Sequence, residues 1–275
     1  MILFTGGAGF IGSHLVDRLI ADGKDVAVID NLSTGREENL NPKAFFIKKD
    51  IRDPISIAAD IDVVFHLAAF SRVRPSLVSS SFGSQCYEVN TMGTWNILEL
   101  ARRMGARVVY AGSSTAQERF GSPYSYSKWV GDEHCRFFSA AYDMTTSIAR
   151  FFLVYGPRQI AAGSYANVIG IFESQKRSGQ PLTITGDGNQ MRDFIHVSDV
   201  VDALIAMSEL RDCRGREFNL GSGRNHSINE IADLFGGPRE YIPLPPREAR
   251  IISMNERPHW EPKIRVEDYI REVAK

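Results

Sequence analysis

The stretch that decides the fold of this chain is TGGAGFIGSHL, residues 5–15. It follows a short apolar run and opens a segment whose apolar residues recur at helical spacing. Its glycines are Gly6, Gly7, Gly9 and Gly12, which fit both GxGxxG and GxxGxxG. Because glycine has no Cβ, the backbone at these positions can approach a pyrophosphate closely. The N-terminus of the following helix offers the pyrophosphate free N–H groups. The stretch predicts a dinucleotide site; the alternative is a glycine-rich turn that only packs a helix on a strand.

Apolar runs and amphipathic segments alternate through the first half of the chain. We expect strands at residues 2–4, 26–29, 44–50, 62–69, 107–114 and 145–157, and helices at 10–21, 90–105 and 129–143. This alternation predicts an α/β fold with a Rossmann-type doubly wound parallel sheet. After residue 157 the pattern loosens. We expect a dinucleotide-binding domain at 1–155, with a return of 191–212, and a smaller, irregular substrate lobe at 156–190 and 213–275.

The composition excludes several classes of protein. Of 275 residues, 43% are hydrophobic and 24% charged, and the net charge is −1, so no strong field exists to collect nucleic acid or an acidic membrane. No apolar run reaches about 18 residues, and the N-terminus has no signal-peptide pattern. The cysteines Cys86, Cys135 and Cys213 stand far apart, which predicts neither a disulfide framework nor a metal site. We therefore expect no membrane span, no metal and a reducing, cytoplasmic location.

Asp30 ends the second predicted strand, roughly 20 residues after the glycines, where a dinucleotide fold places a carboxylate. We expect Asp30 to accept hydrogen bonds from the adenosine ribose hydroxyls and to repel a 2′-phosphate, so NAD is favoured over NADP. Arg36 lies nearby and weakens that distinction.

Further cofactor contacts are expected where later strands end. Asp50 and Ile51 end the third strand, where an adenine edge could be read, although Asp50 could equally cap a loop. The small residues after the fourth strand would let the backbone line the cofactor; they are Leu67, Ala68 and Ala69. His66 beside them is predicted to be a packed core histidine rather than a catalyst.

The segment SPYSYSKWVGDE, residues 122–133, contains two tyrosines and one lysine. On a helix, positions i and i+4 share a face, so Tyr124 faces Lys128 and Tyr126 does not. A free phenol titrates near ~10, and a nearby ammonium and a nicotinamide would lower that pKa. Ser113 and Ser114 end the fifth strand, where a hydroxyl could share the proton path. The alternative is an ordinary exposed helical pair.

Together these motifs resemble one known family. The chain is similar to the extended short-chain dehydrogenases/reductases, in particular the NAD-dependent nucleotide-sugar epimerases and dehydratases such as UDP-glucose 4-epimerase. The resemblance rests on TGGAGFIGSHL, DNLSTGR, HLAAFSRVRPS, NTMGTWNILELAR, YSYSK, ARFFLVYGPRQ, GDGNQMRDFIHVSDVVDA and FNLGSG, and it extends over nearly the whole length.

The resemblance implies a role for particular residues. The implied catalytic set is Ser113, Tyr124 and Lys128, with Ser113 favoured over Ser114, and both serines near the substrate. The implied cofactor contacts are Gly6, Gly9, Phe10, Ile11, Asp30, Asn31, Asp50, Ile51, Leu67, Ala69 and Asn90. Arg192 is implied to meet the nucleotide diphosphate, because a guanidinium offers a charged fork to phosphate oxygens. A surface salt bridge of Arg192 with Asp187 or Asp193 is the alternative.

The resemblance also implies a reaction. We expect Tyr124 to take the proton of the sugar C4 hydroxyl while C4 gives hydride to NAD, with the hydride then returned to the other face. The alternatives are a dehydratase, a reductase of a 4-keto sugar, or a non-catalytic NAD-binding member. In the family, helices like those at 87–104 and 124–142 build a homodimer, although an ordinary buried helix pair is equally open.

Three features depart from the family pattern. The connection SSTAQERFGSPY is short, so we expect a more open sugar site. Leu153 stands where an Asn is common, and the C-terminal tail is short, with Arg247 or Arg250 as possible substrate-binding residues. The strand end SSTA carries no carboxylate to drive loss of water, so epimerisation is favoured over dehydration.

Overall fold

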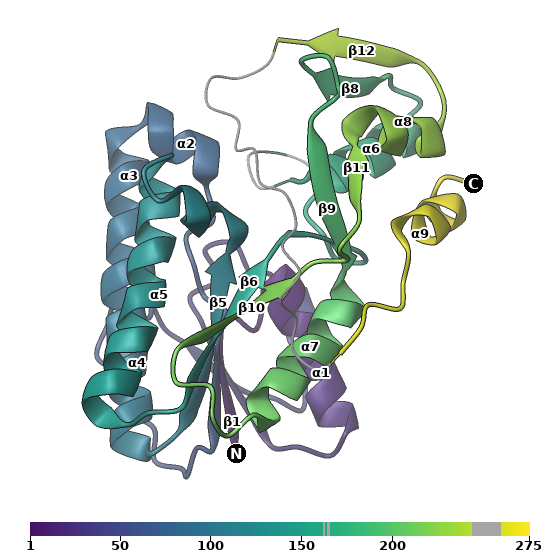
Figure 1. Cartoon of the computed structure of the whole chain (residues 1–275). Helices are drawn as coiled ribbons and strands as arrows, with labels where there is room; N and C mark the ends of the chain where they lie inside the picture. The colour runs from purple at the N-terminus through teal and green to yellow at the C-terminus, as the bar shows by residue number, and fades with distance from the viewer. Residues whose placement is uncertain (162, 164–165, 244–259) are drawn as a thin grey trace. The chain divides into compact units, whose positions relative to one another are not determined.

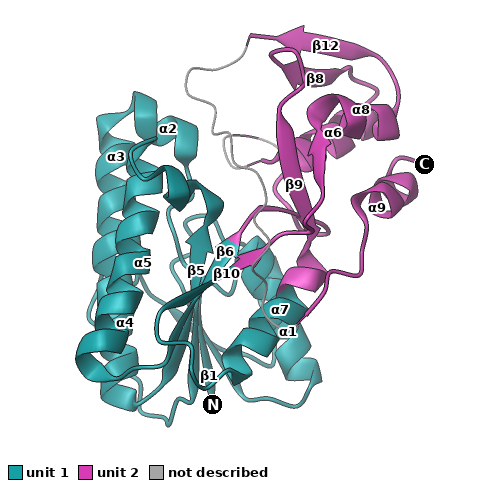
Figure 2. Ribbon diagram, viewed as in Figure 1, with its two compact units in different colours: residues 1–150, 201–218 teal, residues 151–200, 219–275 magenta. Residues whose placement is uncertain are grey.

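The computed structural model describes residues 1–161, 163, 166–243 and 260–275 (Figure 1). The chain forms two compact units (Figure 2). The N-terminal unit comprises residues 1–150 and 201–218, and the C-terminal unit comprises 151–200 and 219–275. Arg247 and Arg250 lie outside the described residues.

The N-terminal unit is built on a seven-stranded sheet in the order β10-β6-β5-β4-β1-β2-β3 (Figure 1). Its strands are β1 (Ile2–Thr5), β2 (Val26–Asp30), β3 (Phe45–Lys48), β4 (Val63–His66), β5 (Arg107–Ser113), β6 (Thr146–Phe151) and β10 (Arg216–Leu220). The strands β1 to β5 pair in parallel. The order β3-β2-β1-β4-β5-β6 is that of a dinucleotide-binding sheet, which confirms the predicted fold class.

The helices of this unit are α1 (Phe10–Ala21), α2 (Val73–Val78), α3 (Ser80–Tyr87), α4 (Thr94–Met104), α5 (Pro123–Tyr142) and α7 (Val197–Glu209), the last extending from the C-terminal unit. Short turns η1 (Glu37–Asn39), η2 (Glu88–Gly93) and η3 (Ser114–Glu118) join them, and η2 is a π-helical turn leading into α4. The helix α5 begins where Ser122 accepts a hydrogen bond from the Ser125 N–H and Pro123 takes the first helical position, both strong start signals.

The segment at 145–157, expected as one strand, is two strands in the structure. β6 belongs to the large sheet, whereas β7 (Leu153–Tyr155) pairs with β9 (Met191–His196) in a separate sheet. Between them the Phe152 N–H donates to the Leu220 carbonyl at 3.3 Å, where the chain changes sheets.

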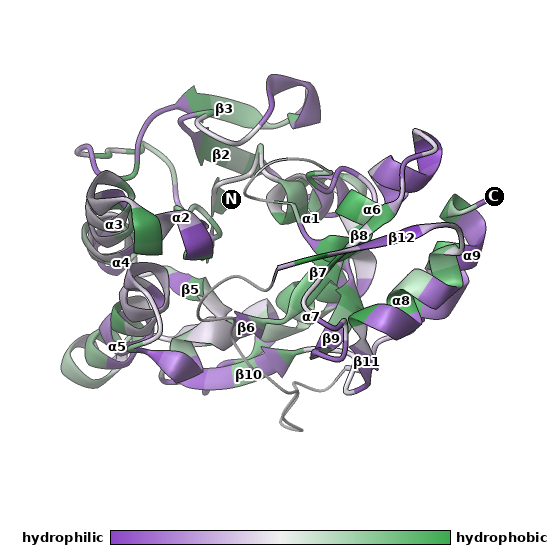
Figure 3. Ribbon diagram, turned by 90° about the horizontal axis from the view of Figure 1, so that it is seen from above, coloured by the Kyte–Doolittle hydropathy of each residue, from purple (hydrophilic) through white to green (hydrophobic). Residues whose placement is uncertain are grey.

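Among its described residues, the C-terminal unit packs two small sheets and three helices around one core. The sheets are β11-β9-β7 and β12-β8, with β8 (Leu182–Thr185), β11 (Asn225–Ser227) and β12 (Arg239–Ile242). The helices are α6 (Val168–Arg177), α8 (Ile228–Phe235) and α9 (Val266–Val273). They bury Phe172, Phe235 and Ile270 together with Phe194 of β9. In Figure 3 these helices carry both hydrophobic and hydrophilic turns, as expected of helices with one buried side.

Within the described residues, none of the helices has the length and apolar character needed to cross a bilayer.

Candidate active site

The glycine-rich turn between β1 and α1 has the shape of a phosphate cradle. Gly6 has φ +78°, and a Cβ there would lie 2.6 Å from the Ala68 backbone nitrogen. A Cβ on Gly12 would lie 2.2 Å from the Gly6 carbonyl oxygen. A Cβ on Gly9, the N-cap of α1, would meet only that same oxygen, at 3.2 Å, among the described residues beyond its chain neighbours. Two glycines are thus required by packing, while Gly9 leaves room above the helix N-terminus, which fits a pyrophosphate.

Asp30 closes the loop beside this cradle. Its carboxylate is buried and accepts hydrogen bonds from the Ala8 N–H at 3.0 Å and the Leu32 N–H at 2.8 Å. Burial raises its pKa, and the two backbone hydrogen bonds oppose that rise. Each carboxylate oxygen keeps a lone pair for a ribose hydroxyl. Nearby, Arg36 lies 3.5 Å from Glu38 in an exposed ion pair.

Asn31 and Asp50 meet at the carboxyl ends of β2 and β3. The Asn31 amide donates to Asp50 at 2.8 Å, and Arg52 contacts the same carboxylate through its backbone N–H and guanidinium. The Arg52 hydrogen bonds lower the pKa of Asp50 to about 2. Asp50 therefore caps this loop, and the next residue, Ile51, is buried against α4.

His66 is fully buried at the end of β4, as predicted for a core histidine. Its imidazole lies between Thr5 (2.6 Å) and Thr94 (3.0 Å). Burial, and secondly the charge of Lys128, lower its pKa to about 3, so it stays neutral. The same Thr5 hydroxyl accepts the Ala68 N–H at 3.3 Å, which fixes the strand end against the glycine turn. The residues that follow, Leu67, Ala68 and Ala69, are half-buried there.

Asn90, in the π-helical turn η2, ties three segments together. Its amide oxygen accepts the Phe70 N–H at 2.7 Å, and its amide nitrogen donates to the Phe70 carbonyl at 3.1 Å and to Ser127 at 2.9 Å. Both amide hydrogens are thus used inside the protein. Asn90 fixes the loop after β4 against α5, next to Lys128.

The two tyrosines of α5 have different surroundings. Tyr124 is buried, whereas Tyr126 is 39% exposed. Burial raises the pKa of Tyr124, and hydrogen bonds with Ser113 and Ser71 oppose that rise. Lys128, one turn later, is buried, and burial lowers its pKa to about 8. The structure thus brings together Ser113, Tyr124 and Lys128 in the N-terminal unit.

Two predicted site residues begin α1, and one follows β5. Phe10 and Ile11 are half-buried in the first turn of α1, directly after the glycines. Ser114 is less buried than Ser113, whose hydroxyl lies 2.9 Å from that of Thr115. Ser71 was not predicted from the sequence, although its place just after the fourth strand gave the same signal as Ser113 after the fifth.

Arg192 lies in the C-terminal unit, at the second position of β9, and its guanidinium donates to the Met191 carbonyl at 2.8 Å. Asp187 and Asp193, the alternative partners of Arg192, both accept hydrogen bonds from backbone N–H groups. Asp187 accepts the Asn189 N–H at 3.0 Å, and buried Asp193 accepts the Ser222 and Gly223 N–H groups at 2.7 and 2.9 Å.

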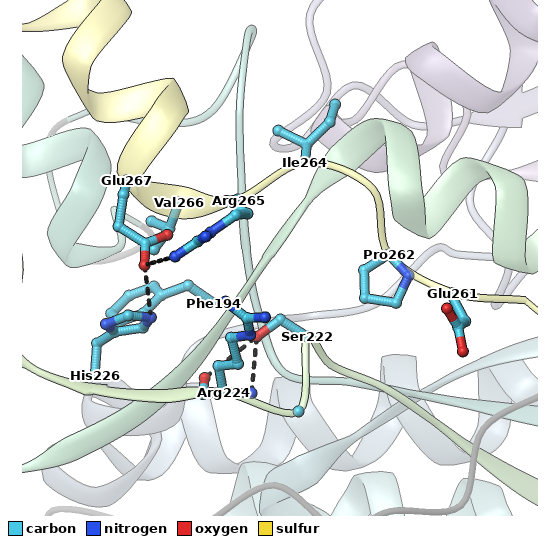
Figure 4. Close-up of a pocket in the computed structure, with 11 residues that line it drawn as sticks. Phe194, Ser222, Arg224, His226, Glu261, Pro262, Ile264, Arg265, Val266 and Glu267 are labelled. Carbon is cyan, nitrogen blue, oxygen red and sulfur yellow. Dashed lines mark hydrogen bonds and ion pairs between the residues drawn. The ribbon is translucent and has the colours of Figure 1, made fainter.

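The C-terminal unit also contains a pocket of about 360 Å³ between β9, β11 and the segment that leads into α9 (Figure 4). Glu267 lies at its wall, 2.9 Å from the Arg265 guanidinium and 4.0 Å from His226. Arg224 and Glu261 complete its charged lining, so positive and negative groups largely compensate.

Among the residues that the structure describes, no three His, Cys, Asp or Glu side chains come close enough together to hold a metal ion. The three cysteines are free and buried, and burial raises the pKa of each thiol.

Two features together characterise the short-chain dehydrogenases/reductases. One is a Rossmann fold whose first βα turn is a glycine cradle, and the other is a Tyr and a Lys one turn apart on a helix of that fold. Residues 2–221 match the model of the NAD dependent epimerase/dehydratase family. The chain belongs to this family. The NAD dependence of the family confirms the cofactor predicted from the sequence.

The chain is similar over its whole length to sugar-nucleotide enzymes. It is 38% identical to a protein described as a putative UDP-glucose 4-epimerase of Methanocaldococcus jannaschii, covering 100% of this chain and 97% of that protein. UDP-glucuronic acid decarboxylase 1 of Arabidopsis thaliana is 34% identical, over 96% of this chain and 66% of that one. Among solved structures, UDP-glucose 4-epimerase of Thermotoga maritima with UDP-glucose is 31% identical, with a TM-score of 0.88, covering 99% and 97%.

Proposed function

We propose that the protein is an NAD-dependent epimerase of a nucleotide sugar, most closely a UDP-sugar 4-epimerase. The observation that carries the proposal is the buried Tyr124, hydrogen-bonded by Ser113 and one helical turn from buried Lys128. The likeness to proteins described as UDP-glucose 4-epimerases, over nearly the full length, supports the same reaction.

In this proposal the chain's residues handle the proton and the charge. Tyr124, as phenolate, takes the proton of the sugar C4 hydroxyl and later returns it. Hydrogen bonds from Ser113 and Ser71 oppose the effect of burial on the Tyr124 pKa. In the proposal, the ammonium of Lys128, one helical turn away, adds positive charge that stabilises the phenolate. Bound NAD would supply a reversible hydride acceptor for C4 and would not be consumed overall. The glycine turn, Asp30 and Asn31 would hold it.

A dehydratase needs a carboxylate beside the sugar, and none stands at the end of β5 or in the three residues after it. The residues there are Ser113, Ser114, Thr115 and Ala116. Hydroxyls can share a proton but cannot act as a strong base for elimination at neutral pH. Decarboxylation is the second candidate reaction, because the chain resembles a UDP-glucuronic acid decarboxylase nearly as closely as it does the epimerases.

We also propose that the C-terminal unit binds the nucleotide sugar, with Arg192 on its diphosphate, and that the protein is a cytoplasmic homodimer. Exposed apolar side chains along η2 and α5 support dimerisation: Met92 is 55% exposed, and Phe137 and Tyr142 are each 45% exposed. Aromatic stacking joins α4 to α5 at this surface, because the ring centroids of Trp95 and Phe137 lie 5.7 Å apart.

The test is incubation of the protein with UDP-glucose, UDP-galactose, UDP-N-acetylglucosamine, UDP-glucuronic acid and dTDP-glucose, with products resolved by chromatography and mass. We expect interconversion of two sugars of equal mass, with no net NADH formed. A product lighter by the mass of water would show that the reaction is dehydration, and one lighter by carbon dioxide would show decarboxylation. Either would contradict epimerisation. A protein that retains NAD but converts none of the five would contradict the proposal.

A further inference from the structure

The face of α5 that carries Tyr124 and Lys128 continues with an acid, Asp132. The three residues are spaced four apart, so they lie along one side of the helix. Lys128 is 2% exposed and Asp132 is 0% exposed. Burying a carboxylate is costly unless positive charge surrounds it, so the partners of Asp132 define what this residue does.

The two carboxylate oxygens of Asp132 have unequal surroundings. Oδ2 accepts a hydrogen bond from Arg150 Nη2, on β6, at 3.0 Å. The same Arg150 nitrogen lies 2.8 Å from Glu217 of β10, which also pairs with Arg136. Oδ1 is buried and has no hydrogen-bond partner among the described residues. One side of this carboxylate is therefore neutralised through Arg150, whereas Oδ1 has no such partner among the described residues.

Lys128, four residues before Asp132 on α5, carries a positive charge on the same side of the helix. Its nitrogen lies 4.2 Å from the ring centroid of Tyr110, on β5. The absence of a side chain at Gly131 lets Tyr110 lie this close to α5, because a Cβ there would be 2.1 Å from the Tyr110 oxygen. Lys128 thus rests on an aromatic face, between the Tyr124 turn and the Asp132 turn.

We propose that Asp132 is a positioning residue that acts through Lys128, keeping its ammonium charged and in place beside Tyr124. The role rests on the proposed function only in that Lys128 serves Tyr124; the coupling of Asp132 to Lys128 does not depend on the substrate.

The electrostatics of the helix agree with this geometry. Burial lowers the pKa of Lys128 to about 8, and Asp132 is the first group that opposes this, followed by Cys135. Burial raises the pKa of Asp132 to about 6, and Arg150, then Lys128 and Arg136, oppose it. Other titratable groups that face the pair are Tyr110, neutral His66 and Tyr124, and the charge of Asp132 contributes to the raised pKa of Tyr124. Each member of the pair therefore favours the charged form of the other.

The first test is direct titration of Lys128 by NMR in protein with ¹³C-labelled lysine, the signal being assigned by its loss in Lys128→Met. In Asp132→Asn we expect Lys128 to titrate about one pH unit lower, a tenfold change. Glu217→Gln is the matched control, because it removes the other carboxylate from Arg150 and leaves Asp132 in place. An unchanged Lys128 titration in folded Asp132→Asn would overturn the proposal, as would an equal shift in Glu217→Gln.

Asp132→Asn removes a charge from a buried ion pair and could prevent folding, so the coupling is also measured from the other side. In Lys128→Met, which leaves an apolar side chain on the Tyr110 ring, the Asp132 carboxyl carbon should titrate about one pH unit higher. No change there refutes the coupling without any Asp132 variant.

The second readout is the pH profile of turnover. With Asp132→Asn, loss of kcat at high pH should begin about one pH unit lower than in the parent, with KM for the nucleotide sugar unchanged. Asp132→Glu should restore the profile. If the five-sugar panel finds no substrate, the NMR titrations still decide the role of Asp132, so the two proposals fail separately.

Discussion

The hydroxyl of Thr5 and the imidazole Nδ1 of His66 lie 2.6 Å apart, and both side chains are fully buried. Thr94 donates its hydroxyl to the Asn90 carbonyl, so the other ring nitrogen of His66 must donate to Thr94. Nδ1 is then the acceptor, and Thr5 donates to it. The ring is held as one neutral tautomer, which joins β1, β4 and α4 beneath the glycine turn.

This neutral ring predicts acid sensitivity. The folded pKa of His66 is about 3, against about 6.5 for an unfolded chain. Between these values the unfolded state binds a proton that the folded state does not, so stability falls as pH falls through this window, by up to about 1.4 kcal/mol per pH unit. In His66→Gln this contribution disappears. Urea unfolding at several pH values below 6.5 should show a shallower pH dependence for the variant, and parallel curves would contradict the assignment.

Two glycines of the same turn should respond differently to alanine. Gly12→Ala places a Cβ against the Gly6 carbonyl, so we expect it to destabilise the protein by about 1–3 kcal/mol. Gly9→Ala meets only one neighbour, at 3.2 Å, so it should fold. We expect Gly9→Ala to weaken NAD binding at least about tenfold, because its methyl occupies the approach of the pyrophosphate. Calorimetric titration with NAD checks this, and Gly9→Ala with parental NAD affinity would remove Gly9 from the cofactor site.

The strands of the fold differ in how well the sequence predicts them. The runs at β1, β2, β4 and β5 are recognisable because strands buried on both faces are continuously apolar. β11 (Asn225–Ser227) has no apolar residue at all and is a strand only because it pairs with β9. The division of 145–157 between two sheets is equally hidden, since no polar or turn residue marks Phe152.

Some residues of the candidate site can be predicted from local sequence, and others cannot. Tyr124 and Lys128 are predicted from spacing within one helix, which is local information. Asp132 shares that spacing, but its partner Arg150 comes from β6 and is shared with Glu217 of β10, so its burial cannot be read from the sequence around it. The same is true of Thr5 and Thr94, which meet only through the imidazole of His66.

The exposed aromatic side of α5 predicts an oligomer that a single charge should dissociate. Phe137 is 45% exposed and stacks on Trp95, so Phe137→Glu would place a carboxylate in the proposed helical interface. We expect the dissociation constant of the dimer to rise at least about tenfold, which light scattering coupled to size exclusion would measure. Phe45→Glu is the control, because Phe45 is 66% exposed on β3 at the sheet edge. A parent protein that is monomeric at all concentrations would refute the dimer.

Tyr124→Phe tests the phenol itself. The variant keeps the ring, loses only the oxygen bonded by Ser113 and Ser71, and leaves the Ser122 cap and Lys128 in place, so we expect it to fold. NAD should remain bound, because the glycine turn and Asp30 are untouched. Turnover should fall by about 10²–10⁴-fold, the usual effect of losing a general base. Tyr126→Phe, two residues on and exposed, is the matched control and should keep parental activity. Near-parental turnover in Tyr124→Phe, on whichever nucleotide sugar the protein converts, would show that another group moves the proton.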